Sequence, residues 1–585
     1  MTRLVRLFFL VSASVLITGA TSYGQTTPPP RQPEDDVVRI NTELVQSDVM
    51  VFDKKGRVVD QLKPEQFQLV IDHQPQPIAF FEHVTANSRG QQGSKTANDL
   101  SSTTAARTHR GRIVLFFVDD LHLAPDSLVR TRKALLDFVN GGIAENDLVA
   151  VTSSSGQIGF LQQFTDDKLV LQSAVARLSY RGSQNRDMEN PPMSQYMALQ
   201  IRNGDESAIS YYVTEMMKQN CVKVNSEMIC MMDTHAARNL VIQRAGQIVT
   251  ESTPDTNNTL LMLEGLMRSA AQLPGRKLVF VISDGFYLND RQTASTDRIK
   301  RITTAAGKAG VVIYTLDARG IVSENIDATN NRPTDSEGLT VASTIGEITA
   351  SQDGLNALAG DTGGRAFRNT NRPMSEWVDD VIDETSNYYL LAWRPGTEEQ
   401  KRGKFNHISV TIKNRPDLTV RLRRGYFKTS PLPMLTTMTK PGKDPTKARE
   451  DDMRVIIDAP VPLHDVPTDL SLDLVQMPGV GTKVVATLKI NREGLAFDTT
   501  NNKSAADVDI GAIFYDDKGK PKTSFVGRLR ISALPENLTE TKRQAVYNFQ
   551  AWLPAGLYQV RVGTRDARSG KLGSAMQWIK IPTLN

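Results

Sequence analysis

The sequence predicts an α/β protein in which a doubly wound, mostly parallel sheet is flanked by further β structure. Short runs that are apolar throughout, as in strands buried on both faces, recur at residues 112–119, 148–153, 277–282 and 311–316. Segments with helical spacing separate these runs, and this alternation is typical of parallel sheets. Before and after this region, apolar and polar residues alternate instead, which predicts antiparallel strands.

Length and composition set the outer limits of the interpretation. The chain has 585 residues, of which 39% are hydrophobic and 23% are charged, as in ordinary globular proteins. At about 150 residues per domain, three to four domains are expected. The formal net charge is only +4, so we expect no general nucleic-acid surface and no nucleic-acid partner. Two cysteines exclude a site with four cysteine ligands.

The first 24 residues have the pattern of a secretory signal peptide. Arg3 and Arg6 precede an apolar run at 7–17, and Ser22 and Gly24 place small residues at the expected cleavage site. An uncleaved N-terminal anchor is the alternative. No later stretch reaches 18 uninterrupted apolar residues, so no transmembrane segment is expected after signal removal. We therefore predict export to the periplasm or the cell exterior.

Changes in composition divide the rest of the chain. Two insertions are expected to interrupt an α/β domain. The first ends at residue 233, and the second is polar and is expected to be a loop. The predicted order is a linker at 25–36, an N-terminal β segment at 37–85, a linker at 86–110, an α/β domain at 111–387 with insertions at 179–233 and 320–353, a β segment at 388–428 that pairs with 37–85, a linker at 429–450, and a C-terminal β-sandwich at 451–585.

Five segments in this order carry a resemblance to a known family. They read VQSDVMVFDKKGRVVDQLKPEQFQLVID (45–72), IVLFFVDDLHL (113–123), KLVFVISDG (277–285), LAGDTGGRAF (358–367) and YYLLAWRP…RLRRGYF (388–427). The α/β domain resembles a von Willebrand factor type A (VWA) domain, which has a Rossmann-like fold. More specifically, residues 37–427 resemble exported bacterial proteins with a VWFA-related domain, of the kind known from Acidobacteria. The C-terminal β region lies outside the resemblance.

The resemblance implies a metal-ion-dependent adhesion site in degenerate form. The family pattern is Asp-x-Ser-x-Ser after the first strand, then a Thr and a later Asp, which together hold Mg²⁺ or Ca²⁺. Asp119, Thr259 and Asp284 match three of these ligands, but leucines stand where both serines should be. The alternative is structural: Asp119 and Asp284 cap helices, and Thr259 is the N-cap of a helix at 260–272.

Three further polar residues fall at the carboxyl ends of predicted strands, where open α/β sheets bind their ligands. Asp120, His122 and Asp317 are therefore candidates for a binding face. Imidazole is a poor ligand for Mg²⁺ or Ca²⁺, so His122 is a weak replacement for a missing serine.

The two cysteines lie nine residues apart in the first insertion. In an exported chain, this favours a disulfide between Cys221 and Cys230. The alternative is a Cu(I) site, built from both cysteines and the neighbouring methionines Met216, Met217, Met228, Met231 and Met232.

These observations predict an exported, non-enzymatic protein that mediates protein–protein interaction or adhesion at the cell envelope. Its partner would be a protein, and no cofactor beyond Mg²⁺ or Ca²⁺ is expected. One alternative is an adhesion module that still depends on a divalent metal. Another is a hydrolase that uses Asp119, Asp120 and Asp284 as acid and base. The sequence contains neither a Gly-x-Ser-x-Gly elbow nor a Walker A loop.

Overall fold

The structure is a computed structural model, and it describes most of the chain from residue 45 onward. The described residues are 45–84, 112–144, 147–181, 187, 189, 191–224, 227–271, 273, 277–288, 294–321, 339–385, 387–394, 405–422, 425–427, 453–459, 462–477, 481–500, 503–533 and 544–583. The predicted signal peptide at 1–24 and the predicted linkers at 25–36, 86–110 and 429–450 lie outside them.

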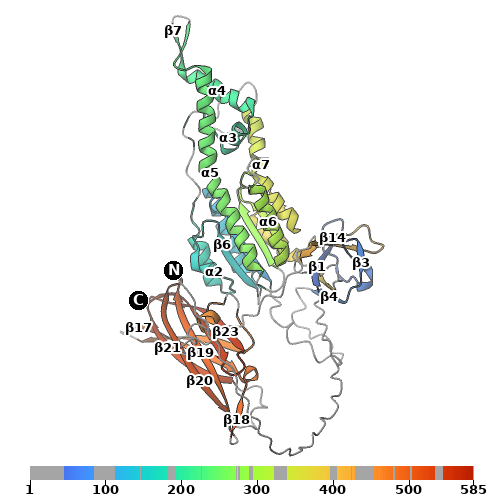
Figure 1. Cartoon of the computed structure of the whole chain (residues 1–585), viewed down its shortest axis with the longest axis vertical. Helices are drawn as coiled ribbons and strands as arrows, with labels where there is room; N and C mark the ends of the chain where they lie inside the picture. Colours follow the sequence, from blue (N-terminus) through green and yellow to red (C-terminus); the bar gives the residue numbers. More distant parts are fainter. Residues whose placement is uncertain are drawn as a thin grey trace, which may run out of the picture. The chain divides into compact units, whose positions relative to one another are not determined.

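A five-stranded parallel sheet forms the centre of the α/β domain, which confirms the predicted mixed α/β class (Figure 1). Its strand order is β11–β10–β9–β5–β6, and all neighbours are parallel. Every residue of β5, β9 and β10 is buried, as their uninterrupted apolar runs predict. The bounds are β5 Ile113–Val118, β6 Leu148–Ser153, β9 Lys277–Ser283, β10 Val311–Asp317 and β11 Ala366–Phe367.

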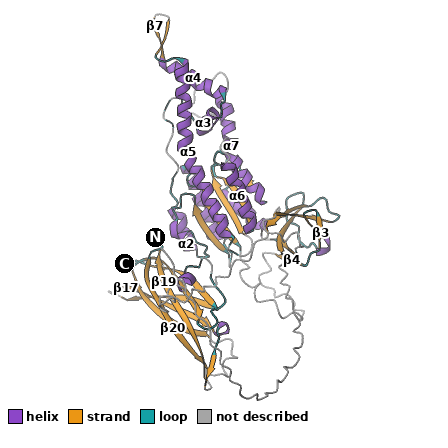
Figure 2. Cartoon of the chain, viewed as in Figure 1, coloured by secondary structure: helices purple, strands orange, loops and turns teal. Residues whose placement is uncertain are grey.

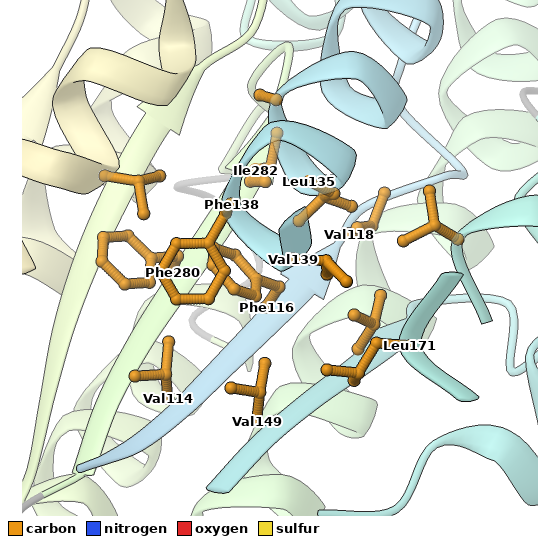
Figure 3. Close-up of a cluster of buried hydrophobic side chains, with 14 of the residues drawn as sticks. Val114, Phe116, Val118, Leu135, Phe138, Val139, Val149, Leu171, Phe280 and Ile282 are labelled. Atoms are coloured by element: carbon orange, nitrogen blue, oxygen red, sulfur yellow. The ribbon is translucent and has the colours of Figure 1, made fainter. Parts of the chain in front are cut away.

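Helices cover both faces of this sheet. Phe116 and Phe117 are neighbours in β5 but belong to different cores, because successive side chains of a strand point to opposite faces. On the Phe116 side, Phe116 stacks on Phe280 at a ring distance of 5.1 Å, and Phe138 packs edge-on against it (Figure 3). The helices on this side are α1 Pro125–Asp137, α2 Lys168–Arg177 and α8 Met374–Thr385.

The opposite face is covered by α5 Thr234–Ala270, α6 Ala294–Ala309 and α7 Leu339–Thr362. Helix α7 corrects the prediction that the whole segment 320–353 is a loop. Ser351, Gln352 and Leu355 are buried in it, and Leu358 packs in the same core as β9 and β10. Tertiary packing therefore outweighs the weak helix propensity of this Ser- and Thr-containing stretch. Residues 322–338 lie outside the described part.

Helix α5 is much longer than the helix predicted at 260–272. Its 37 residues span about 55 Å at 1.5 Å per residue, and they include Pro254 in the helix interior. The prediction that Thr259 is an N-cap is therefore wrong, because Thr259 lies in the middle of α5. The first insertion also does not end as a separate unit at residue 233, since Asp233 is itself the N-cap of α5.

The N-terminal half of α5 belongs to a helical arm that extends beyond the sheet (Figure 1). It shares an apolar core with α3 Gln195–Arg202 and α4 Glu206–Asn220. After α4, the chain forms a two-stranded hairpin at the end of the arm, from β7 Cys221–Val224 and β8 Glu227–Cys230. We call residues 191–253 the arm.

Two four-stranded sheets combine strands from both sides of the α/β domain in sequence. One has the order β14–β1–β12–β4 and the other β15–β13–β2–β3. They share a core that contains Phe67, Tyr389 and Trp393. The bounds are β1 Val45–Phe52, β2 Phe67–Ile71, β3 Gln74–Gln76, β4 Phe80–Val84, β12 Tyr388–Trp393, β13 Phe405–Ile412, β14 Thr419–Leu422 and β15 Gly425–Phe427.

The C-terminal region is antiparallel β structure (Figure 2). One sheet has the order β16–β17–β21, and the other has β18–β19–β22–β23 with β20 also paired to β19. Residues 453–457 form a helical turn ahead of the first strand of this region. The bounds are β16 Thr468–Met477, β17 Gly481–Asn491, β18 Asp498–Thr500, β19 Lys503–Asp516, β20 Pro521–Ala533, β21 Gln544–Leu553, β22 Gly556–Asp566 and β23 Leu572–Ile581.

Candidate functional site

The carboxyl ends of the parallel strands bring most of the predicted site residues to one edge of the sheet. Asp119 and Asp120 follow β5, Asp284 follows β9, and Asp317 ends β10. The register places Asp317 beside Ser283, the last residue of β9. We call this region the carboxyl edge.

Asp119 is fully buried and its carboxylate accepts hydrogen bonds from three side chains. The Thr259 hydroxyl donates to Oδ1 at 2.7 Å and the Ser283 hydroxyl donates to Oδ2 at 2.8 Å. Nδ1 of His122 lies 3.0 Å from Oδ1 and 2.9 Å from Oδ2. Because a carboxylate only accepts, Nδ1 carries the proton in this contact.

His122 bridges the turn after β5 and helix α5. Its Nε2 lies 3.3 Å from the Thr256 hydroxyl, and its ring centroid lies 5.9 Å from that of Phe286. Burial lowers the pKa of His122, but the charge of Asp119 and the bond to it raise that pKa more, and the net shift is upward. Burial raises the pKa of Asp119. Its contacts with His122, Thr259 and Ser283 lower that pKa by more, so the net shift is downward.

Helix α5 supplies two hydroxyls to this cluster. Thr256 and Thr259 are three residues apart, so they lie on the same side of the helix, and both are buried. Sequence reasoning identifies Thr259 only through the family pattern, and it misses Thr256 and Ser283 as partners. The available signal for Ser283 is a polar residue that ends an otherwise apolar strand.

Asp284 contacts the start of helix α1. Its Oδ2 accepts from the backbone N–H of Ala124 at 2.7 Å, and Ala124 is an N-cap residue whose own side chain cannot cap the helix. A carboxylate at this position also interacts favourably with the helix dipole. Burial raises the pKa of Asp284 to about 6, although the bonds from Ala124 and the Ser127 hydroxyl lower it.

The two other candidate carboxylates each have their own partners. Asp120 is buried and accepts from the Ser154 hydroxyl at 2.7 Å, the Ser155 N–H at 2.9 Å and Gln157 Nε2 at 2.5 Å. It therefore orders the turn after β6.

Asp317 is also buried at the carboxyl edge. It forms an ion pair with Arg319 at 2.7 Å and accepts from Gln352 Nε2 at 2.7 Å. Arg319 in turn brings a positive charge near Asp284 and contributes to lowering the pKa of that carboxyl. The structure thus brings all the predicted edge residues into one region, but as pairs rather than as one open set of ligands.

The donor set at the carboxyl edge does not fit Mg²⁺ or Ca²⁺. These cations need at least six oxygen ligands, including waters, and both leucines of the Asp119–Leu123 turn lack a donor atom. Leu123 is 1% exposed and packs in the sheet core. Within the described residues, no group of three or more His, Cys, Asp or Glu side chains is placed to hold a metal ion.

The predicted disulfide is confirmed in the arm. Cys221 and Cys230 are bonded to one another and face each other across the hairpin. Their sulfurs are therefore not available as thiolate ligands, which argues against the copper alternative. Met216, Met217 and Met232 pack against the arm core instead, as methionines commonly do. No helix among the described residues has the length and apolar character needed to cross a membrane.

Comparisons with known proteins show no relationship for the chain as a whole. No family model matches it, and no curated protein matches it. Two solved structures that match cover about a fifth of this chain. A β-glucuronidase from Bacteroides uniformis is 11% identical over 20% of this chain and 13% of that one, with a TM-score of 0.13. A Bordetella pertussis protein described as ApaA is 12% identical over 21% of this chain and all of that one, with a TM-score of 0.12.

Proposed function

We propose that the chain is an exported, non-enzymatic protein of the VWA type that binds a protein partner through its arm and the adjoining carboxyl edge. The sheet supports the VWA assignment, since it is parallel and its first strand β5 lies between β6 and β9, with β10 and β11 added beyond β9. The disulfide supports an oxidising compartment such as the periplasm or the cell exterior.

The observation that carries this proposal is the apolar end of the arm. Val222 and Ile229 are cross-strand partners in the hairpin, and they are 56% and 55% exposed. Met231, immediately after the hairpin, is 85% exposed. Apolar side chains held on a disulfide-closed hairpin lose little conformational freedom on binding, and such preorganisation favours association.

Site-specific photocrosslinking tests this proposal. A photoreactive amino acid at Met231 should give discrete protein adducts in an envelope extract from the producing organism. The same probe at Val129, which is 66% exposed on α1, is the matched control and should give none. Ile229→Glu should abolish the adducts, whereas Val129→Glu should not affect them. Equal labelling from both positions, or none from Met231, would contradict the proposal.

A hydrolase is the second candidate, and one observation favours it. The pKa of Asp119 is lowered and that of Asp284 is raised to about 6, and such a divergence allows one carboxyl to act as a base and another as an acid. A panel of ester, peptide and glycoside substrates would test it. Turnover by the wild type that is lost in Asp284→Asn would favour the hydrolase over a binding protein.

A further inference from the structure

We infer that the imidazole of His122 occupies the place of a divalent cation at the carboxyl edge, and that this edge is built to work without metal. The inference rests on the VWA assignment proposed above, because that assignment is what leads one to expect a cation next to Asp119. It concerns the chemistry of the site itself, and it is independent of which partner the arm binds.

The first argument is the acceptor capacity of Asp119. A carboxylate offers about four lone-pair positions. Oδ1 faces the Thr259 hydroxyl and Nδ1 of His122, and Oδ2 faces the Ser283 hydroxyl and the same Nδ1. Three donors therefore surround Asp119, which the family pattern places first, and the single Nδ1–H of the ring lies against both carboxylate oxygens. A cation could bind Asp119 only by displacing the ring.

The second argument is that the ring makes the connections that a bridging cation would make. Through Nδ1 it contacts the residue after β5, and through Nε2 it approaches Thr256 of helix α5. Thr256 and Thr259 both come from α5, so the ring and Asp119 together fix this helix to the sheet. The N-terminal half of the same helix forms part of the arm.

The third argument is that the turn holds the ring in place. The backbone N–H groups of His122 and Leu123 both donate to the carbonyl of Asp119, at 3.0 and 3.1 Å. The Leu121 N–H donates to the Ser154 hydroxyl at 3.3 Å, and Leu123 anchors the turn in the core. The leucines that remove two oxygen ligands thus contribute to presenting the imidazole to Asp119.

The test measures the binding of Mn²⁺, the paramagnetic substitute for Mg²⁺, to the purified mature chain. Electron paramagnetic resonance detects the bound metal at Mn²⁺ concentrations up to 10 mM. The wild type should bind none through this site, and a chelator should leave its melting temperature unchanged. The double variant Leu121→Ser/His122→Ala removes the ring and restores one hydroxyl. It should gain a Mn²⁺ site with a dissociation constant in the millimolar range, and Asp119→Asn in that background should abolish the gain.

Two results would overturn the inference. One is Mn²⁺ binding by the wild type that is lost in Asp119→Asn, because the site would then hold metal with the ring present. The other is a folded double variant that binds no Mn²⁺, because the ring would then not be what stands in the place of the metal. Circular dichroism verifies the fold of each variant. The assay uses no partner, so its outcome is separate from that of the photocrosslinking experiment.

Discussion

At the scale of single residues, the carboxyl edge shows how similar carboxyl groups acquire different properties. Asp119 and Asp284 both follow buried strands, yet their pKa values shift in opposite directions. Asp119 has a histidine and two hydroxyls around it, whereas burial dominates at Asp284. Strand-end position was enough to predict that both residues lie at this edge. It could not predict their partners, because Thr259 donates to Asp119 from the middle of α5, and the Ala124 N–H donates to Asp284 from the start of α1.

Asp284 should make stability depend on pH. Its pKa is about 6 in the folded chain, against an ordinary value of 3.8, so the folded state binds this proton more tightly. The free energy of unfolding therefore decreases as the pH rises from about 4 to 6. At about 1.4 kcal/mol per pKa unit, Asp284→Asn should become more stable relative to wild type by up to about 3 kcal/mol across this range.

Urea unfolding at pH 4, 5, 6 and 7 measures this difference. Asp126→Asn, at an exposed carboxyl on α1, is the control and should leave the pH profile of the wild type unchanged. If Asp284→Asn and wild type differed by the same free energy of unfolding at all four pH values, the raised pKa of Asp284 would be contradicted.

At the scale of elements, helix α5 is where sequence reasoning failed most clearly. A proline such as Pro254 usually ends a helix, and a threonine followed by an apolar run, such as Thr259, resembles a helix start. Both signals are local. The helix continues because its two halves are packed by different partners, Val241 and Val249 in the arm core and Leu260 and Leu263 against the sheet. Long-range packing of this kind is not visible in a local pattern.

Replacing Pro254 should strengthen the middle of α5. Proline in a helix interior costs about 3 kcal/mol relative to alanine, and it removes one backbone donor. Pro254→Ala should therefore slow amide exchange in residues 246–258 by at least about ten-fold, which corresponds to roughly 1.4 kcal/mol. Asn258→Ala, at an exposed position in the same helix, is the control and should give a much smaller change. Unchanged exchange in Pro254→Ala would mean that packing alone sets the stability of this region.

The disulfide should stabilise the hairpin and no other part of the domain. Cys221 and Cys230 close a small loop at the end of the arm, away from the sheet cores. In Cys221→Ser/Cys230→Ser, amide exchange at 221–224 and 227–230 should rise at least about ten-fold, because the short hairpin has little packing to hold it. The exchange of β5 and β9 serves as the internal control and should not change. Faster exchange in those strands would show that the hairpin supports the whole domain.

At the scale of the whole molecule, the sequence could predict the division into α/β and β regions. Periodicity distinguishes uninterrupted apolar strands such as β9 from alternating ones such as β17. The pairing of the two β segments followed from their position on either side of the α/β domain. Which strands are neighbours could not be predicted, because the order β14–β1–β12–β4 depends on contacts between segments far apart in the chain.

Tyr389 should report on the closure between these two β segments. Its hydroxyl accepts from the N–H of Leu62 and donates to the carbonyl of Val59, each at 3.0 Å. Tyr389→Phe keeps the ring but leaves a buried donor without its partner, at an expected cost of about 1–3 kcal/mol. Differential scanning calorimetry should show a lower melting temperature for the β region that contains Tyr389. The melting temperature of the α/β region should not change. Tyr180→Phe, at an exposed tyrosine, is the control. An equal shift in both regions would indicate that they unfold together.

The split β region also affects how the chain folds while it is being synthesised. Leu62 reaches its partner Tyr389 only 327 residues later. At a synthesis rate of about 5–20 residues per second, the early strands wait roughly 15–65 s for the strands that complete their sheets. During that time β1 and β4 have their edges open and their apolar faces uncovered. We therefore expect β1 and β4 to need chaperone protection until β12 has been synthesised, whereas the α/β domain can fold before them.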